Sequence, residues 1–163
     1  MKSNLVIIGM PTAGKTTLST LLAKETGRRL ISMDKELERE MKMSIADCFQ
    51  RYGEGYFRDR ESDLAARAGK EKGCVIDCGG GIILREENMQ ALQENGTIIW
   101  IDRPLEFLFP STDRPLSRDP EAVAELYEHR QPYYRKWADI IIHNDRTIDE
   151  ALQEILTLME NSK

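Results

Sequence analysis

Five short apolar runs divide the chain, and amphipathic stretches separate them. The runs cover residues 5–8, 29–33, 74–78, 97–101 and 139–142. Most of them are rich in β-branched residues and all are too short for a typical helix, which predicts buried strands. Strands that are apolar on both faces belong in a parallel sheet with helices on both sides. The pattern therefore predicts an α/β fold built on a five-stranded parallel sheet.

The stretches between the runs carry apolar residues at helical spacing. They predict helices over about 17–27, 34–42, 44–49, 56–72, 86–94, 105–109, 121–136 and 148–159. Gly27 is expected to cap a helix, Gly53 and Gly55 to break the helical pattern, and Pro132 to interrupt a helix. Thr147 begins a capping box. Residues 110–120 contain three prolines and few apolar residues, which predicts a mobile surface loop.

Composition describes an ordinary globular protein. The chain has 163 residues, of which 40% are hydrophobic, and a formal net charge of −5. With no repeat, linker or low-complexity tract, one domain over residues 1–163 is expected. No block of Lys and Arg stands out, so neither nucleic acid nor a membrane is an expected partner. A monomer is expected, although nothing in the sequence determines the oligomeric state. The first strand leaves no room for a signal peptide, and the three cysteines form no disulfide or zinc pattern, so a cytoplasmic location is expected.

A phosphate-binding motif follows the first apolar run. It fits G-x-x-x-x-G-K-[ST] and reads Gly9-Met10-Pro11-Thr12-Ala13-Gly14-Lys15-Thr16. The glycines let the loop turn its N–H groups toward phosphate oxygens, and the following helix adds positive charge at its N-terminus. Lys15 is expected to reach the β- and γ-phosphates of ATP, and the Thr16 hydroxyl to bind Mg²⁺. The predicted nucleotide-binding residues are Gly9, Pro11, Thr12, Ala13, Gly14, Lys15, Thr16 and Thr17.

Other candidate residues also follow predicted strands. Asp34 ends the second strand, Asp77 and three glycines end the third, and residues 102–118 follow the fourth. Ligands of parallel α/β sheets bind beyond the carboxyl ends of the strands. These residues are therefore expected to meet the phosphate loop at one edge of the sheet.

The motifs beyond the phosphate loop resemble those of shikimate kinases, a family of small P-loop kinases. They are Gly53-Glu54-x-x-Phe57-Arg58-x-x-Glu61, Gly79-Gly80-Gly81, Arg114-Pro115-Leu116 and Arg130-x-Pro132-x-Tyr134. The resemblance runs nearly end to end. It implies a three-layer sandwich like that of nucleoside monophosphate kinases, with substrate-binding helices at about 34–72 and a lid at about 110–120. It also implies ATP-dependent phosphorylation of shikimate to shikimate 3-phosphate, a step in aromatic amino acid biosynthesis.

The resemblance implies a role for each matching residue. Asp34 would bind the hydroxyls of shikimate and accept a proton, while Arg58 and Arg130 would grip its carboxylate. Arg114 would reach the transferring phosphate, Glu61 would orient Arg58, and the glycine triplet would lie against the ring. These residues suit such roles, because guanidinium groups bind carboxylates in a bidentate manner and glycines allow close approach. The predicted catalytic residues are Lys15, Asp34 and Arg114.

The chain departs from the family pattern in two places. Ser32 stands where the family usually has an aspartate that helps to hold Mg²⁺. Asp77 either replaces that aspartate, with Thr16 as the other metal-binding residue, or caps the following turn. The arginine that stacks on adenine near the start of the lid is also missing. Arg146 would then contact the adenine, or is simply exposed in a loop.

Structural explanations compete with the functional ones. Asp34 could cap a helix, Arg58 could belong to a charged helix face, and Arg130 could face solvent. A related gluconate-like or nucleotide-like kinase is the nearest alternative function, and a nucleotide-binding module without turnover is another. The acceptor side offers arginines and a carboxylate, and no groups that would hold a base, which favours a small hydroxy acid.

Overall fold

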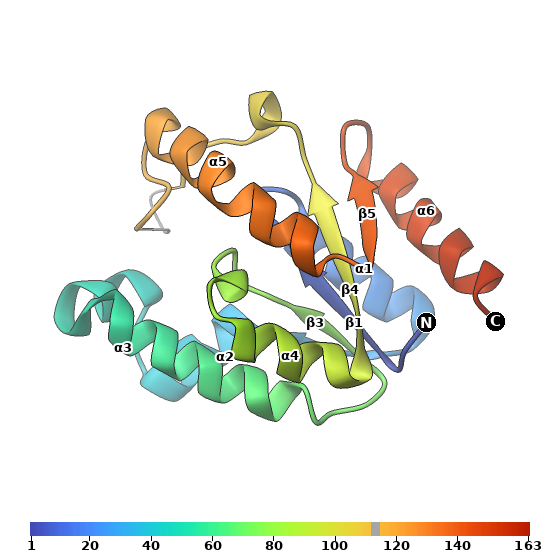
Figure 1. The fold of residues 1–163 in the computed structure, drawn as a ribbon, viewed down its shortest axis with the longest axis horizontal. Coiled ribbons are helices and arrows are strands. Elements are labelled where there is room, and N and C mark those ends of the chain that lie inside the picture. Colours follow the sequence, from blue (N-terminus) through green and yellow to red (C-terminus); the bar gives the residue numbers. More distant parts are fainter. Residues whose placement is uncertain (112–114) are drawn as a thin grey trace.

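The protein is described here by a computed structural model that covers residues 1–111 and 115–163. Its strands form one parallel sheet in the order β2-β3-β1-β4-β5 (Figure 1). The strands are β1 (Asn4–Ile8), β2 (Arg29–Ser32), β3 (Cys74–Asp77), β4 (Gly96–Asp102) and β5 (Ile140–His143). Residues 5–8 of the central strand β1 are completely buried, as the continuous apolar run predicts. The prediction of a five-stranded parallel sheet is confirmed.

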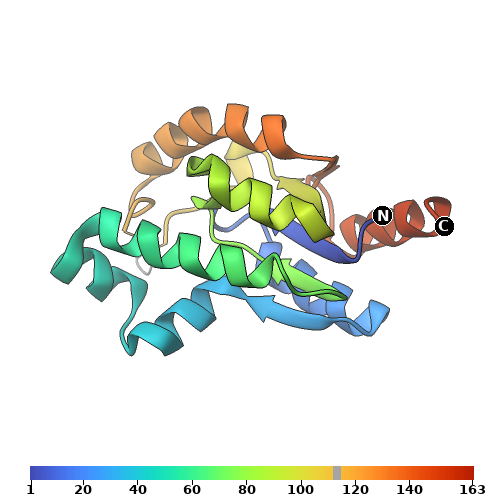
Figure 2. The same cartoon turned by 60° about the horizontal axis from the view of Figure 1, so that its bottom comes forward.

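Helices cover both faces of this sheet. They are α1 (Lys15–Thr26), α2 (Met33–Met41), α3 (Ile45–Ala68), α4 (Glu86–Asn95), α5 (Pro120–Trp137) and α6 (Ile148–Asn161), with short 3₁₀ helices η1 (Ile82–Leu84) and η2 (Leu105–Phe107). Figures 1 and 2 show α4 and α5 on one face and α1 and α6 on the other. Helices α2 and α3 pack together and extend beyond the sheet, beside its β2 edge (Figure 2). The predicted three-layer α/β architecture is confirmed.

Three local predictions need correction. Strand β2 ends at Ser32 and α2 begins at Met33, so Asp34 lies in the first turn of a helix and not at a strand end. The predicted break at Gly53 is confirmed, because its φ of 84° and ψ of 169° are non-helical and kink α3 there, but Gly55 lies inside the helix that follows and does not break it. Helix α5 runs through Pro132 without ending. Burial of its residues Arg130 and Tyr134 on both sides of Pro132 offsets the lost hydrogen bond.

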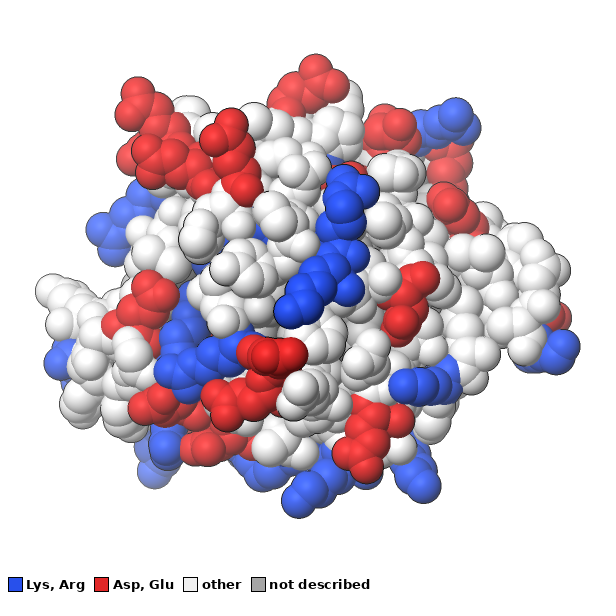
Figure 3. Space-filling view, viewed as in Figure 1, with Lys and Arg blue, Asp and Glu red and all other residues white. Residues whose placement is uncertain are grey.

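Two predicted caps are confirmed, whereas α3 ends at Ala68, before the predicted end at Lys72, and the helix predicted over 105–109 is only the 3₁₀ turn η2. Gly27 caps α1 with a left-handed φ of 67°, and Thr147 and Glu150 make both hydrogen bonds of the capping box of α6. In the space-filling view, acidic and basic side chains are interspersed over the face that α4 and α5 cover (Figure 3). Within the described residues, every helix is too short or too polar to cross a membrane.

Candidate active site

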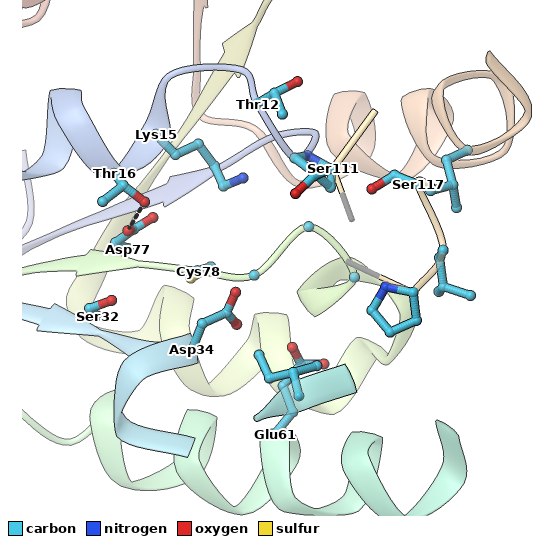
Figure 4. A pocket seen from close by; sticks show the side chains of 18 of the residues that line it. Thr12, Lys15, Thr16, Ser32, Asp34, Glu61, Asp77, Cys78, Ser111 and Ser117 are labelled. Atoms are coloured by element: carbon cyan, nitrogen blue, oxygen red, sulfur yellow. Dashed lines mark hydrogen bonds between the residues drawn. The ribbon is translucent and has the colours of Figure 1, made fainter. Parts of the chain in front are cut away.

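The phosphate loop lies between β1 and α1, at the carboxyl edge of the sheet. Gly9 and Gly14 have φ values of 150° and 94°, and a Cβ at Gly9 would be 2.6 Å from the carbonyl oxygen of Ile101. Lys15 is buried, and its Nζ donates a hydrogen bond to the carbonyl of Met10 at 3.0 Å. Figure 4 shows this side chain pointing into the pocket. Of the predicted nucleotide-binding residues, those that line the pocket are Pro11, Thr12, Gly14, Lys15, Thr16 and Thr17.

Two predicted residues support the loop from behind. Ala13 is buried, and its carbonyl accepts a hydrogen bond from Nδ2 of Asn144 at 2.9 Å. Gly9 brings the loop against the end of β4. Sequence reasoning missed Asn144, which follows β5 and carries no motif. The rule that ligand sites gather at strand ends would have pointed to it.

Asp77 connects the third strand to the phosphate loop. Its Oδ2 accepts a hydrogen bond from the Thr16 hydroxyl at 2.9 Å (Figure 4). Ser32 and Asp77 are direct register partners on the neighbouring strands β2 and β3. The chain thus has a carboxylate one strand away from the position where the family pattern has one, and this carboxylate already touches the predicted metal-binding hydroxyl.

The glycine triplet brings the predicted acceptor-binding groups together. A Cβ on Gly79 would lie 2.7 Å from Oδ1 of Asp34, and a Cβ on Gly81 would collide with the guanidinium of Arg58. At Gly80 a Cβ would be 2.8 Å from Nη1 of Arg130. Asp34 comes from α2, Arg58 from α3 and Arg130 from α5. Three charged groups from three helices therefore face one stretch of bare backbone.

Gly80 also connects the two ends of the pocket. The position of its missing Cβ is 2.9 Å from Cδ of Pro11, which belongs to the phosphate loop. Residues from both ends line a single pocket of about 630 Å³, with Lys15 and Asp34 on opposite sides in Figure 4. A ligand bound against the triplet would therefore lie next to a phosphate held by the loop.

Buried charges distinguish the acceptor end. Arg58 pairs with Glu61 at 2.9 Å, and the Glu61 side chain is only 1% exposed. Burial raises the pKa of the Glu61 carboxyl, and the Arg58 guanidinium opposes that shift. Arg130 is only 3% exposed, which excludes the explanation that it faces solvent. Among the described residues, the buried Nε atom of Arg130 has no hydrogen-bond partner, and that of Arg58 has only an ion pair with Oε2 of Glu54 at 3.5 Å. Buried donors left in this state favour an anionic ligand.

Tyr134 holds the glycine triplet in place through the carbonyl of Gly80. Its ring stacks on Trp100 with centroids 5.7 Å apart, and its hydroxyl donates a 2.6 Å hydrogen bond to the carbonyl of Gly80. Burial raises the pKa of Tyr134 to about 12, although Arg130 and Arg58 oppose the shift. The folded protein therefore holds this proton more tightly than the unfolded chain does.

This shift predicts a difference in stability at alkaline pH. Because the folded pKa is raised, the stabilisation by Tyr134 is complete below about pH 10 and is lost as the pH rises through about 12. The free energy of unfolding of wild type, measured relative to that of Tyr134→Phe, should fall by up to roughly 3 kcal/mol in this window. Denaturant titrations at a series of pH values measure it. Tyr133→Phe, at a 40% exposed position on the same helix, is the control and should show no such change. If the difference in unfolding free energy between wild type and Tyr134→Phe did not change with pH, Tyr134 would not have a raised pKa in the folded protein.

The segment after β4 supplies residues that sequence reasoning missed. Arg103 lines the pocket, and its Nη1 lies 3.4 Å from the carbonyl of Thr12. Ser117 also lines it and is buried. The predicted catalytic residue Arg114 lies outside the described residues, as does part of the predicted lid. Arg146 is exposed and is not among the described residues that line the pocket, which favours its reading as a loop arginine.

Comparisons with known proteins agree on one family. The family model described as shikimate kinase matches residues 11–160. A shikimate kinase from Clostridium beijerinckii is 42% identical over 159 residues, which are 95% of this chain and 94% of that protein. The shikimate kinase from Acinetobacter baumannii, solved in complex with shikimate, superposes with a TM-score of 0.93 at 29% identity, covering 100% of this chain and 96% of the other. The shikimate kinase from Aquifex aeolicus superposes with a TM-score of 0.85 at 30% identity, covering 98% of this chain and 97% of the other.

Proposed function

The chain belongs to the shikimate kinase family, and we propose that the pocket beside the phosphate loop is where it binds ATP and shikimate. The protein catalyses the ATP-dependent phosphorylation of shikimate in the biosynthesis of aromatic amino acids. One observation carries the assignment of the site: Asp34, Arg58 and Arg130 converge on the glycine triplet next to Lys15. A gluconate kinase, a nucleotide kinase and a module without turnover have no comparable support.

The acceptor end suits a small hydroxylated carboxylate. Arg58 and Arg130 would bind the carboxylate through their planar guanidinium groups, and Glu61 fixes the orientation of Arg58. The ring would lie on the backbone of the triplet, where any side chain would fill its space. Asp34 would hold the hydroxyl that is phosphorylated, which we take to be the 3-hydroxyl, and would accept its proton. Because phosphoryl transfer has a loose transition state, positioning contributes more than proton abstraction.

The phosphate end suits the triphosphate of ATP. The N–H groups of the loop and the N-terminus of α1 would bind the phosphate oxygens. Lys15 would exchange its bond to the Met10 carbonyl for the β- and γ-phosphates. Its positive charge would then stabilise the negative charge that develops on the transferred group.

The residues near Thr16 fit a magnesium ion. Mg²⁺ usually takes one or two protein oxygens and fills its other positions with water and phosphate oxygens. The Thr16 hydroxyl would be such an oxygen, and the Asp77 carboxylate, 2.9 Å from it, would support it. When bound, Mg²⁺ supplies positive charge to the β- and γ-phosphates. Asp77 would orient Thr16 and hold water on the metal, the task of the aspartate that Ser32 replaces.

Replacing Asp77 should weaken metal binding. Asp77→Asn keeps the shape and removes the charge, and loss of such a supporting carboxylate typically lowers metal affinity about 10-fold or more. Mn²⁺ binding to the ADP complex, followed by electron paramagnetic resonance, measures this without turnover. Ser32→Asp should restore part of the affinity, because residues 32 and 77 are register partners. Asp149→Asn, at an exposed position of α6, is the control. Unchanged Mn²⁺ affinity in Asp77→Asn would leave Asp77 as a turn cap.

A substrate panel tests the function as a whole. ADP release is measured with shikimate, gluconate and nucleoside monophosphates in parallel. Of these acceptors, only shikimate is expected to be phosphorylated. Turnover with another acceptor and none with shikimate would overturn the proposal. A cytoplasmic monomer that binds neither nucleic acid nor membrane stays a prediction from composition.

A further inference from the structure

Thr12 has an unusual backbone conformation in the phosphate loop. Its φ is +66°, in the left-handed region that β-branched residues rarely adopt. Within the described residues, the other non-glycine residue with positive φ is Lys42, which caps the C-terminus of α2, where this conformation is common. Glycine would adopt the conformation of Thr12 without strain. The threonine side chain must therefore make interactions that hold the loop in this form.

Three hydrogen bonds connect Thr12 to residues 103–109. Its hydroxyl accepts from the backbone N–H of Phe109 at 3.2 Å and donates to the carbonyl of the same residue at 3.3 Å. Its own carbonyl accepts from Nη1 of Arg103 at 3.4 Å. The Arg103 guanidinium in turn lies 5.8 Å from the centre of the Phe107 ring. One residue of the phosphate loop thus contacts both ends of this segment.

Apart from half-buried Leu108, which packs against the core, the large apolar side chains of this segment are exposed. None of the residues in η2 is buried, and Phe107 and Phe109 are 44% and 56% exposed. Segments with few buried apolar contacts depend on individual hydrogen bonds for their position. At position 12, valine would keep the shape of threonine but lose the hydroxyl. Glycine would also lack the hydroxyl, but it would adopt the left-handed backbone without strain. Serine and threonine can both donate to and accept from Phe109 at once.

We propose that Thr12 is a positioning residue that couples nucleotide binding at the phosphate loop to the placement of residues 103–109. The proposal rests on the proposed function only in taking the loop as the nucleotide site. A nucleotide that orders the loop fixes the Thr12 hydroxyl, and the hydroxyl fixes the backbone of Phe109. Because such coupling is reciprocal, the ordered segment also strengthens nucleotide binding. Phe109 and Ser111 line the pocket, so the coupling shapes its wall (Figure 4).

The test compares Thr12→Val, Thr12→Gly and Thr12→Ser. Thr20→Val is the control, because within residues 1–111 and 115–163 the Thr20 hydroxyl bonds only to its own helix, at the Thr16 carbonyl. Residue-resolved hydrogen exchange follows the Phe109 amide with and without ADP, and calorimetry gives the Kd of ADP. In wild type, Thr12→Ser and Thr20→Val, ADP should slow exchange of this amide. In Thr12→Val and Thr12→Gly the amide should exchange about 10-fold faster in the free protein, ADP should protect it less, and the Kd of ADP should rise about 10-fold.

Thermal unfolding separates coupling from simple stability. Thr12→Gly relieves the left-handed strain, so its Tm should equal or exceed that of Thr12→Val while its coupling is equally lost. Wild-type protection of the Phe109 amide by ADP in Thr12→Val would overturn the proposal. So would an unchanged exchange rate of that amide in the free variant, a readout that needs no nucleotide. Failure of wild type to bind ADP would instead count against the proposed function.

Discussion

Lys15→Met is expected to lower kcat at least about 1,000-fold, which corresponds to about 4 kcal/mol of barrier. The Lys15 ammonium is buried, and Figure 4 shows that it points into the pocket at the phosphate end. Methionine keeps the length and the apolar stem but cannot stabilise the charge on the transferred phosphate. The ammonium donates a hydrogen bond to the carbonyl of Met10 and lines the pocket, outside the hydrophobic core, so its loss should affect folding much less than turnover.

The coupled assay of ADP release measures this loss. Lys24→Met, at an exposed position in the last turn of the same helix, is the matched control and should keep wild-type kcat. Thermal unfolding should show both variants folded. If Lys15→Met retained more than about a tenth of wild-type kcat, the lysine would not act on the transferred phosphate.

The sheet and the edge that carries the site could be predicted because both follow from short-range patterns. A strand buried on both faces must be a continuous apolar run, and residues 5–8 and 97–101 are such runs. Once the strands are parallel, whatever follows them gathers at one edge. Asp77 and the triplet were placed correctly on this basis. Asp34 also reaches this edge, from the first turn of α2.

Contacts that depend on neighbouring strands could not be predicted. Thr12 and Arg103 are 91 residues apart, and nothing in either stretch of sequence signals their contact. The same holds for Asn144 and the Ala13 carbonyl. The relation between Ser32 and Asp77 depends on the register of β2 against β3, which the sequence does not specify. This register gives a structural basis to the interpretation that Asp77 supports a metal ion.

Local rules failed where packing overrode them. Proline normally ends a helix, but Pro132 lies between Arg130 and Tyr134, which are both buried. Ending α5 there would remove Tyr134 from Trp100 and from the carbonyl of Gly80. The burial of an aromatic side chain, about 2 to 3 kcal/mol, is comparable to the cost of the proline. The helix therefore continues, and it carries an arginine to the pocket.

That arginine gives the second large effect: Arg130→Lys is expected to raise the KM for shikimate about 100-fold and the KM for ATP much less. The Arg130 side chain is buried, its Nη1 faces Gly80, and its Nε has no hydrogen-bond partner among the described residues. Lysine keeps the charge but loses the fork that would bind a carboxylate at two points. Hydrogen bonds to charged groups contribute about 1.5–3 kcal/mol, which sets the size of the effect.

Two comparisons make the result specific. Arg135→Lys, on an exposed position of the same helix, should leave both KM values unchanged. Arg58→Lys should raise the KM for shikimate and also lower Tm, because Arg58 is the ion-pair partner of buried Glu61. Arg130 has no such partner in the described ion pairs, although its charge acts on Glu61 and Tyr134, so its variant should lose less Tm than Arg58→Lys. Steady-state kinetics with each substrate varied in turn decides the matter: equal changes in the two KM values would mean that Arg130 does not bind the acceptor.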